Sequence, residues 1–123
     1  MSEDEIIMYI VARSDLAMSH GKFGAQCGHG VQLAIRKAES LEDRIPDLKE
    51  WEGKDYVKIT LRVKSQDALV RLGEQLTEAG VPNCIVKDNG RTEIAAGSLT
   101  VLATVPMRKS LLMKTPLKRL QAY

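Results

Sequence analysis

The chain has 123 residues, of which 44% are hydrophobic and 28% charged, and its formal net charge is +2. This length and composition predict one folded domain, residues 1–123, and exclude a disordered chain. No apolar run approaches the roughly 20 residues of a membrane-spanning helix. The N-terminus is acidic (MSEDE), whereas a secretory signal begins with basic residues. We therefore expect a cytoplasmic protein that does not enter a membrane.

The N-terminal part predicts a strand followed by a long helix. Residues 6–12 form a short apolar run rich in isoleucine and valine, which is typical of a buried strand. A helix is expected over residues 22–38. Its predicted core side carries hydrophobic and small residues, namely Phe23, Cys27, Val31, Ala34 and Ala38. Lys22, Gln26 and His29 then fall within about 60° of one another. We place these three on the opposite, polar side of the helix.

Three glycines lie within this expected helix, at positions 24, 28 and 30. Each costs a helix about 1 kcal/mol relative to alanine. The close approach of another backbone, or of a ligand, would explain them.

The rest of the chain continues the alternation of helices and strands. The expected elements, in order, are a short helix with a connection at 41–52, a strand at 56–63, a helix that Ser65 caps and Gly80 ends, and strands at 84–86 and 99–105. Leu69, Leu72 and Leu76 form the buried stripe of the second long helix. A short basic helix should follow Pro106. The pattern predicts an α/β sandwich around a four-stranded sheet.

The cysteines and the basic end each allow a simple interpretation. Cys27 and Cys84 lack the spacing of metal ligands and are expected to be buried, reduced thiols. Beyond Glu93 the chain carries no carboxylate to balance its cations, which are Arg108, Lys109, Lys114, Lys118 and Arg119. This end suits a polyanion such as RNA, or it is an ordinary solvated surface, and the two interpretations have equal weight.

Two polar stretches together predict a hydrolytic site. One is MSHGKFGAQCGH at 18–29, and the other is the turn DNGRT at 88–92. The turn offers a carboxylate and a hydroxyl, which could meet the cation of the helix. Each residue also has a structural interpretation. Asp88 is a good turn former, Lys22 could be a solvated surface lysine and His29 a packing residue. Thr92 could support the turn, and Arg91 could pair with Glu93.

Both stretches resemble the type II peptidyl-tRNA hydrolases, the family of archaea and eukaryotes. The resemblance rests on RSDL at 13–16, on Met18, GK at 21–22, AQC at 25–27 and His29, then on LKEWE at 48–52, DNGRTEIA at 88–95 and GSLTVL at 97–102. These motifs follow the family's order over nearly the whole chain, which is far more specific than any single motif. The resemblance implies three layers, with helices on both faces of a mixed four-stranded sheet. It also implies a homodimer that needs no metal or organic cofactor.

The resemblance further implies an activity and its residues. The family hydrolyses the ester between peptide and tRNA in peptidyl-tRNA, which releases the peptide and recycles the tRNA. The catalytic positions correspond to Lys22, Asp88 and Thr92. The positions that contact substrate correspond to His20, Gln26, His29 and Arg91. Cys27 is expected in the core rather than as a nucleophile.

The alternative is a non-catalytic RNA- or protein-binding module with the same fold. Three departures from the family pattern favour it. His20 stands where members often have a second lysine, and Ala96 stands where they usually have proline. The segment ATVP at 103–106 replaces the Gly-Pro-rich turn that follows the last strand in the family. Intact Lys22, Asp88 and Thr92 favour the enzyme.

Overall fold

A computed structural model describes residues 4–89 and 94–123. Its elements are β1 (Ile6–Arg13), α1 (His20–Glu39), the 3-10 helix η1 (Glu42–Arg44), α2 (Ile45–Glu52), β2 (Lys58–Val63), α3 (Gln66–Glu78), β3 (Asn83–Lys87), β4 (Leu99–Thr104), β5 (Met107–Arg108), α4 (Lys109–Leu112) and the 3-10 helix η2 (Pro116–Arg119). The predicted strands and long helices are therefore confirmed. Within the described residues, no helix has both the length and the apolar character needed to span a membrane.

The strands form one mixed sheet. Its main path has the order β2-β1-β4-β3, and the short β5 pairs with β1 outside this path. β1 and β2 are parallel, whereas β4 is antiparallel to both β1 and β3. β1, β2 and β3 consequently run in the same direction, and their carboxyl ends lie at one edge. The four expected strands make up the main path, and β5 is a strand that the sequence pattern did not predict.

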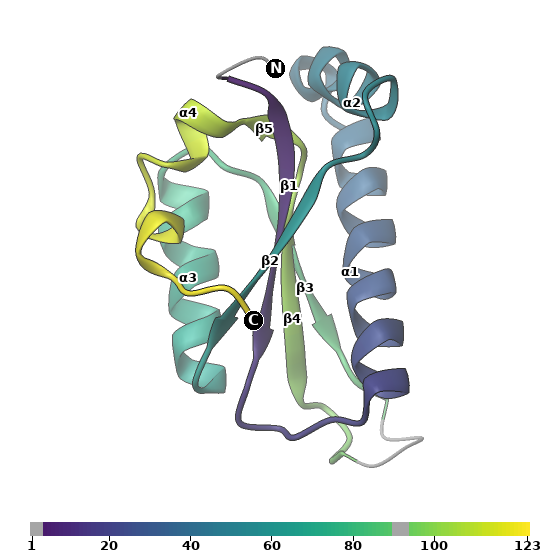
Figure 1. Cartoon of the computed structure of the whole chain (residues 1–123), viewed down its shortest axis with the longest axis vertical. Coiled ribbons are helices and arrows are strands. Elements are labelled where there is room, and N and C mark those ends of the chain that lie inside the picture. Colours follow the sequence, from purple (N-terminus) through teal and green to yellow (C-terminus); the bar gives the residue numbers. More distant parts are fainter. Residues whose placement is uncertain (1–3, 90–93) are drawn as a thin grey trace.

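Helices cover both faces of this sheet (Figure 1). A Cβ atom at Gly30 of α1 would lie 3.2 Å from a methyl carbon of Val101. A Cβ atom at Gly73 of α3 would lie 3.4 Å from a methyl carbon of Leu102, the next residue of β4. Because adjacent residues of a strand point to opposite faces, α1 and α3 lie on opposite sides of the sheet. The predicted three-layer architecture is confirmed.

The side of α1 that faces the sheet agrees with the prediction at Ala34 and Ala38 and differs from it nearer the N-terminus of the helix. Its buried residues are Gln26, Gly30, Ala34 and Ala38. Gln26 was placed on the polar side, but only 4% of its surface is exposed. The row of small residues after it lets the helix approach the sheet closely, and the Gln26 amide lies within that contact. Phe23, Cys27 and Val31 are only partly buried beside it.

The glycines of α1 have different surroundings. Gly30 packs against the sheet, as expected of a close approach. A Cβ atom at Gly24 or Gly28 would have no atom of residues 4–89 or 94–123 within 4 Å. Packing within the described residues therefore explains Gly30 but gives no reason for Gly24 and Gly28.

Local signals in the sequence set several helix ends. Ser65 caps α3 by accepting a hydrogen bond from the Ala68 amide, and Gly80 ends that helix region with a φ of 79°. Ser19 caps α1 by accepting from the Lys22 amide, so the helix starts at His20 rather than Lys22.

Both cysteines are free and half-buried. Burial raises the pKa of the Cys27 thiol, and it also raises the pKa of Cys84, an effect that the nearby Lys37 partly offsets. Their expected reduced state is consistent with this environment.

The edge of β2 is covered by residues 121–123. The Arg62 amide donates to the Gln121 carbonyl, and the Tyr123 amide donates to the Thr60 carbonyl, each at 3.0 Å. The Tyr123 ring then stacks on Phe23 of α1 with ring centroids 4.4 Å apart. This segment thus connects one edge of the sheet to the first turns of α1.

Candidate active site

The candidate site lies where the carboxyl ends of β1 and β3 meet the start of α1, at the lower end of the molecule in Figure 1. Parallel and like-directed strands bring their carboxyl ends to a common edge, and a helix that follows such a strand begins there. Lys22 lies in the first turn of α1. Asp88 is the first residue after β3. Two stretches that are 66 residues apart in sequence are thereby brought together.

Lys22 and Asp88 form an ion pair at this edge. The Lys22 Nζ atom donates a hydrogen bond to Oδ1 of Asp88. Only 9% of the Lys22 side chain and 3% of the Asp88 side chain are exposed. The expectation that this carboxylate meets the lysine of the helix is confirmed. The interpretation of Lys22 as a solvated surface lysine is wrong.

The backbone at the start of the β3–β4 connection fixes the position of Asp88. Its amide donates to the Ser98 carbonyl at 2.8 Å, and its carbonyl accepts from the Gly97 amide at 2.9 Å. Gly97 has a φ of 86°, a region that side chains other than hydrogen disfavour. The glycine therefore allows the turn that returns the chain to β4 beside Asp88.

Arg13 ties three elements together next to this turn, a role that the sequence did not suggest. Its Nε and Nη2 atoms donate to both carboxylate oxygens of Asp15, at 3.0 and 2.7 Å. Its Nη1 atom donates to the Leu99 carbonyl at 3.1 Å and to Oε1 of Gln66 at 3.2 Å. The same Gln66 oxygen accepts from the Leu99 amide at 3.0 Å. Arg13 thus fixes the start of β4, one residue after Ser98, relative to β1 and α3.

A signal for Arg13 was nevertheless present in the chain. The residue begins the RSDL motif and directly ends a strand that is otherwise apolar. An arginine two residues before an aspartate can form such a forked pair. Its contact with Leu99, however, depends on the sheet order and could not be read from the sequence.

The remaining predicted site residues have different environments. Gln26 accepts a hydrogen bond from the Thr100 hydroxyl at 2.5 Å, and both residues are buried. His20 and His29 are exposed on α1. His29 lines a small groove of about 240 Å³ together with Val86 and Asn89. The roles of Gln26, His20 and His29 toward a substrate stay predictions.

Two predicted residues, Arg91 and Thr92, lie outside the described residues. The structure therefore brings together two of the three expected catalytic residues. Among the residues that it describes, no group of three or more His, Cys, Asp or Glu side chains could hold a metal ion.

A buried carboxylate paired with an ammonium group provides the elements of hydrolytic chemistry. A carboxylate can orient a water molecule or accept its proton, and an ammonium group can stabilise a developing oxyanion. The fold and the site thus define an α/β protein with a candidate acid–base pair at the carboxyl edge of its sheet.

Residues 6–123 match the model of the family described as "Peptidyl-tRNA hydrolase PTH2". This match covers nearly the whole chain, and the chain belongs to that family. It confirms the resemblance found in the sequence.

Individual relatives agree with this assignment. A probable peptidyl-tRNA hydrolase 2 of Drosophila melanogaster is 39% identical over 103 residues, which are 84% of this chain and 54% of the relative. One of Dictyostelium discoideum is 43% identical over 100 residues, or 81% of this chain and 47% of the relative. A peptidyl-tRNA hydrolase of Haloquadratum walsbyi is 33% identical over 97 residues, 79% of this chain and 82% of the relative. The chain thus spans about half the length of these eukaryotic relatives and most of the archaeal one.

Proposed function

We propose that this chain hydrolyses the ester bond between peptide and tRNA in peptidyl-tRNA, with Lys22, Asp88 and Thr92 as its catalytic residues. The observation that carries the proposal is the buried Lys22–Asp88 ion pair at the carboxyl edge of the sheet. Family membership supports the reaction, since the matched family and the relatives carry the name peptidyl-tRNA hydrolase.

The proposed mechanism uses water as the nucleophile. Asp88 orients the water and accepts its proton as the oxygen attacks the ester carbonyl. Thr92 shares this water. Lys22 stabilises the negative charge that develops on the carbonyl oxygen. The tetrahedral intermediate then collapses, the bond to the ribose oxygen breaks, and the proton goes to that leaving oxygen. No covalent enzyme intermediate and no metal ion take part.

The proposal also covers the residues that contact the substrate, the oligomeric state and the location in the cell. His20, Gln26, His29 and Arg91 contact the substrate, either directly or, for buried Gln26, by holding α1 in position. We further propose that the chain binds RNA, acts as a homodimer and works in the cytoplasm. Light scattering on the purified protein measures the dimer, and a mass of one chain would refute it.

The test is release of N-acetylaminoacyl groups from tRNA in the presence of EDTA. Purified wild-type protein is compared with Lys22→Met, Asp88→Asn and Thr92→Ala. Each substitution should lower turnover by about 100-fold or more, the effect typical of losing a general acid or base. Lys37→Met is the matched control, because Lys37 is an exposed lysine near the other end of the same helix.

Three outcomes separate the candidate functions. Loss of turnover in the site variants, with full activity in Lys37→Met, supports the hydrolase. Near wild-type turnover in all three site variants refutes the assignment of the residues. No release by the wild type, with tRNA binding retained, identifies the chain as the non-catalytic RNA-binding module.

A further inference from the structure

We propose that the β2 edge of the sheet is a track for the single-stranded 3′ end of the RNA, which runs from a cationic pocket for phosphates between β2, α3 and η2 to Tyr123, a stacking platform for a base beside α1. The proposal rests on the proposed function and names the part of the protein that would hold the RNA. The pocket has a volume of about 390 Å³. Its lining residues are Arg62, Val63, Lys64, Ala68, Arg119, Leu120 and Gln121.

Three of these lining residues are cations, and none is a carboxylate. Arg62, Lys64 and Arg119 are all exposed. No ion pair joins any of them to an acidic residue in the described part of the chain. Arg62 instead donates a hydrogen bond to the Gln121 amide oxygen, which holds the guanidinium at the pocket. Clustered cations repel one another, so this arrangement favours a bound polyanion.

The aromatic platform follows directly along the chain. Gln121 lines the pocket, and Tyr123 lies two residues further in an extended segment, a span of about 7 Å. The Tyr123 ring stacks on Phe23 at an interplanar angle of 26°, which fixes its orientation. Yet 47% of Tyr123 remains exposed. Aromatic side chains beside a cationic groove are the usual means of binding single-stranded nucleic acid without reading its sequence.

The track leads to the candidate catalytic residues. Phe23 directly follows Lys22 in the first turns of α1. The pocket lies at the end of β2, and β2 and β1 are parallel, so it shares the carboxyl edge of the sheet with Asp88. Figure 1 shows the end of β2 and the start of α1 on the two sides of this lower edge. RNA bound at the pocket and on Tyr123 would therefore present its 3′ end near the Lys22–Asp88 pair.

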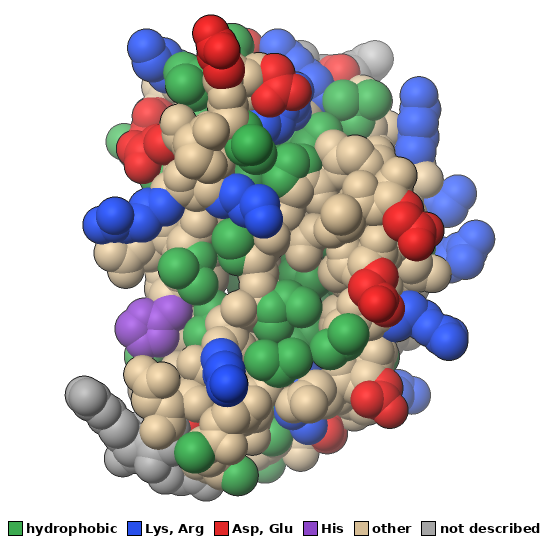
Figure 2. All heavy atoms as spheres, turned by 180° about the vertical axis from the view of Figure 1, so that it is seen from behind, with side chains coloured by type: hydrophobic (Ala, Val, Ile, Leu, Met, Phe, Trp, Pro, Cys, Tyr) green, Lys and Arg blue, Asp and Glu red, His purple; other side chains and the backbone are tan. Residues whose placement is uncertain are grey.

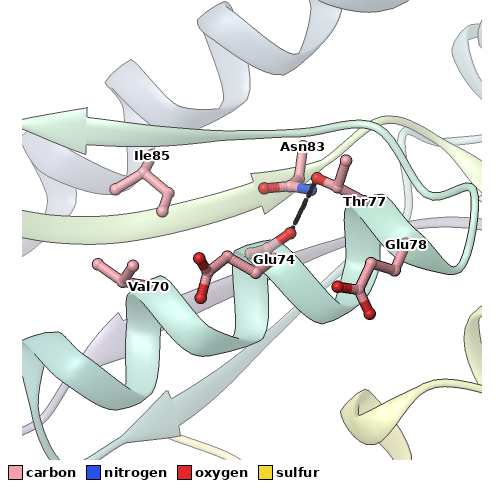
Figure 3. Close-up of a pocket in the computed structure, with 7 residues that line it drawn as sticks. Val70, Glu74, Thr77, Glu78, Asn83 and Ile85 are labelled. Carbon is pink, nitrogen blue, oxygen red and sulfur yellow. Dashed lines mark hydrogen bonds between the residues drawn. The ribbon is translucent and has the colours of Figure 1, made fainter.

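The outer strand on the other side of the sheet, β3, lies beside a surface of the opposite charge. A groove of about 420 Å³ between α3 and β3 is lined by Glu74 and Glu78 and contains no lysine or arginine. Figure 3 shows both carboxylates on α3, with Glu74 on the side of Val70 and Glu78 near Thr77. From this side, Figure 2 shows acidic side chains in a row over α3. These carboxylates would repel RNA, which leaves the β2 side as the favourable approach.

The test measures binding of a fluorescent RNA hairpin with a short single-stranded 3′ extension. Because this RNA carries no ester, the result does not depend on whether the protein is a hydrolase. The variants are Lys64→Gln/Arg119→Gln for the pocket and Tyr123→Ala for the platform. Tyr123→Phe retains the ring. Lys37→Gln is the control, since Lys37 is an exposed cation in the last turn of α1, at the end opposite the track.

The two parts of the track predict different signatures. The pocket variant should weaken binding and lower the slope of log affinity against log salt by about 0.7 for each phosphate that the protein no longer neutralises. Tyr123→Ala should weaken binding about fivefold or more with an unchanged slope, and Tyr123→Phe should restore it. On N-acetylaminoacyl-tRNA, these variants should raise KM and leave kcat unchanged.

Several results would overturn the proposal. Equal weakening by Lys37→Gln would mean that only overall charge matters. Unchanged binding in the pocket variant or in Tyr123→Ala would remove that part of the track. Displacement of the RNA by polyglutamate of equal charge at equal concentration would identify an acidic peptide as the ligand, since polyglutamate has no bases to stack.

Discussion

Two ion pairs in this protein join residues that are distant in sequence, but they differ in their environment. In the Lys22–Asp88 pair, the exposed fractions of the side chains are 9% and 3%. In the Arg108–Glu50 pair they are 37% and 32%, although the geometry is a well-formed fork with both distances at 3.0 Å. An exposed pair gains little because water screens it, whereas a buried pair must lose its hydration.

This difference in burial indicates that the two ion pairs serve different purposes. A buried ion pair is often no more stable than apolar residues of the same size, so it is weak evidence for a role in stability. The Lys22–Asp88 pair also lies at an edge where two strands and a helix start converge. We infer that its purpose is chemical, whereas the Arg108–Glu50 pair only joins α2 to β5 on the surface.

Replacing both members of the buried pair should separate stability from activity more clearly than any other change. Lys22→Met alone leaves the Asp88 carboxylate without its ammonium partner and should lower the free energy of unfolding by about 3–5 kcal/mol. Lys22→Met/Asp88→Leu should regain most of that loss and still be inactive. Urea denaturation and ester hydrolysis measure the two properties. A double variant that is as unstable as the single one would show that the pair serves stability.

Arg13→Lys tests the support behind Asp88. A lysine keeps the charge but not the fork that reaches Asp15, Gln66 and Leu99 together. We expect a loss of about 1–3 kcal/mol in the free energy of unfolding and a lower kcat, with KM unchanged, because the start of β4 would shift relative to Asp88. An unchanged kcat would limit Arg13 to a structural role.

Gly97→Ala tests the turn next to Asp88. Among the described residues, a Cβ atom there would meet the Lys87 Cε atom alone, at 3.7 Å, which leaves space for it. The cost should therefore come from the backbone, whose φ of 86° disfavours alanine by about 1–2 kcal/mol. Thermal unfolding measures this loss. A Gly97→Ala variant as stable as wild type would show that the turn can adopt another backbone conformation at no cost.

The exposed pair should show the smallest effect, and it should depend on pH. The hydrogen bond from Arg108 holds the pKa of Glu50 below its usual value of about 4.3. Because the folded-state pKa is lowered, the pair stabilises the fold above that pH, and this contribution is lost as pH falls through the folded-state pKa. Glu50→Gln should leave hydrolysis unchanged and reduce the dependence of Tm on pH below about pH 4. An unchanged acid profile would show that the pair contributes nothing measurable.

Local signals made much of the fold predictable from the sequence. The apolar run of β1, the Ser65 cap and the Gly80 stop act within a few residues, and each is found where expected. In α1 the predicted face was right for Ala34 and Ala38 but wrong for Gln26, because helix periodicity does not reveal that a row of small residues lets the helix approach the sheet. Nor could it reveal that the buried Gln26 finds its partner in Thr100, 74 residues away.

Several surface contacts could not be predicted because they join residues that are distant in sequence. The basic end of the chain has no carboxylate of its own beyond Glu93, but a carboxylate distant in sequence balances Arg108. Glu50 pairs with it from 58 residues away. Residues 121–123 carry no strand pattern, yet they pair with β2 and place Tyr123 on Phe23. The two polar stretches suggested that Lys22 could meet Asp88, and the family motifs that contain both residues strengthened this prediction.

The most direct test of the account compares the same substitution at two aspartates of one edge. Asp88→Asn and Asp15→Asn both remove a carboxylate, but Asp88 pairs with Lys22 and Asp15 pairs with Arg13. Ester hydrolysis on N-acetylaminoacyl-tRNA should fall by about 100-fold or more in Asp88→Asn and stay within a fewfold of wild type in Asp15→Asn. Equal activity of the two variants, with both folded, would contradict the central claim that the Lys22–Asp88 pair carries the chemistry.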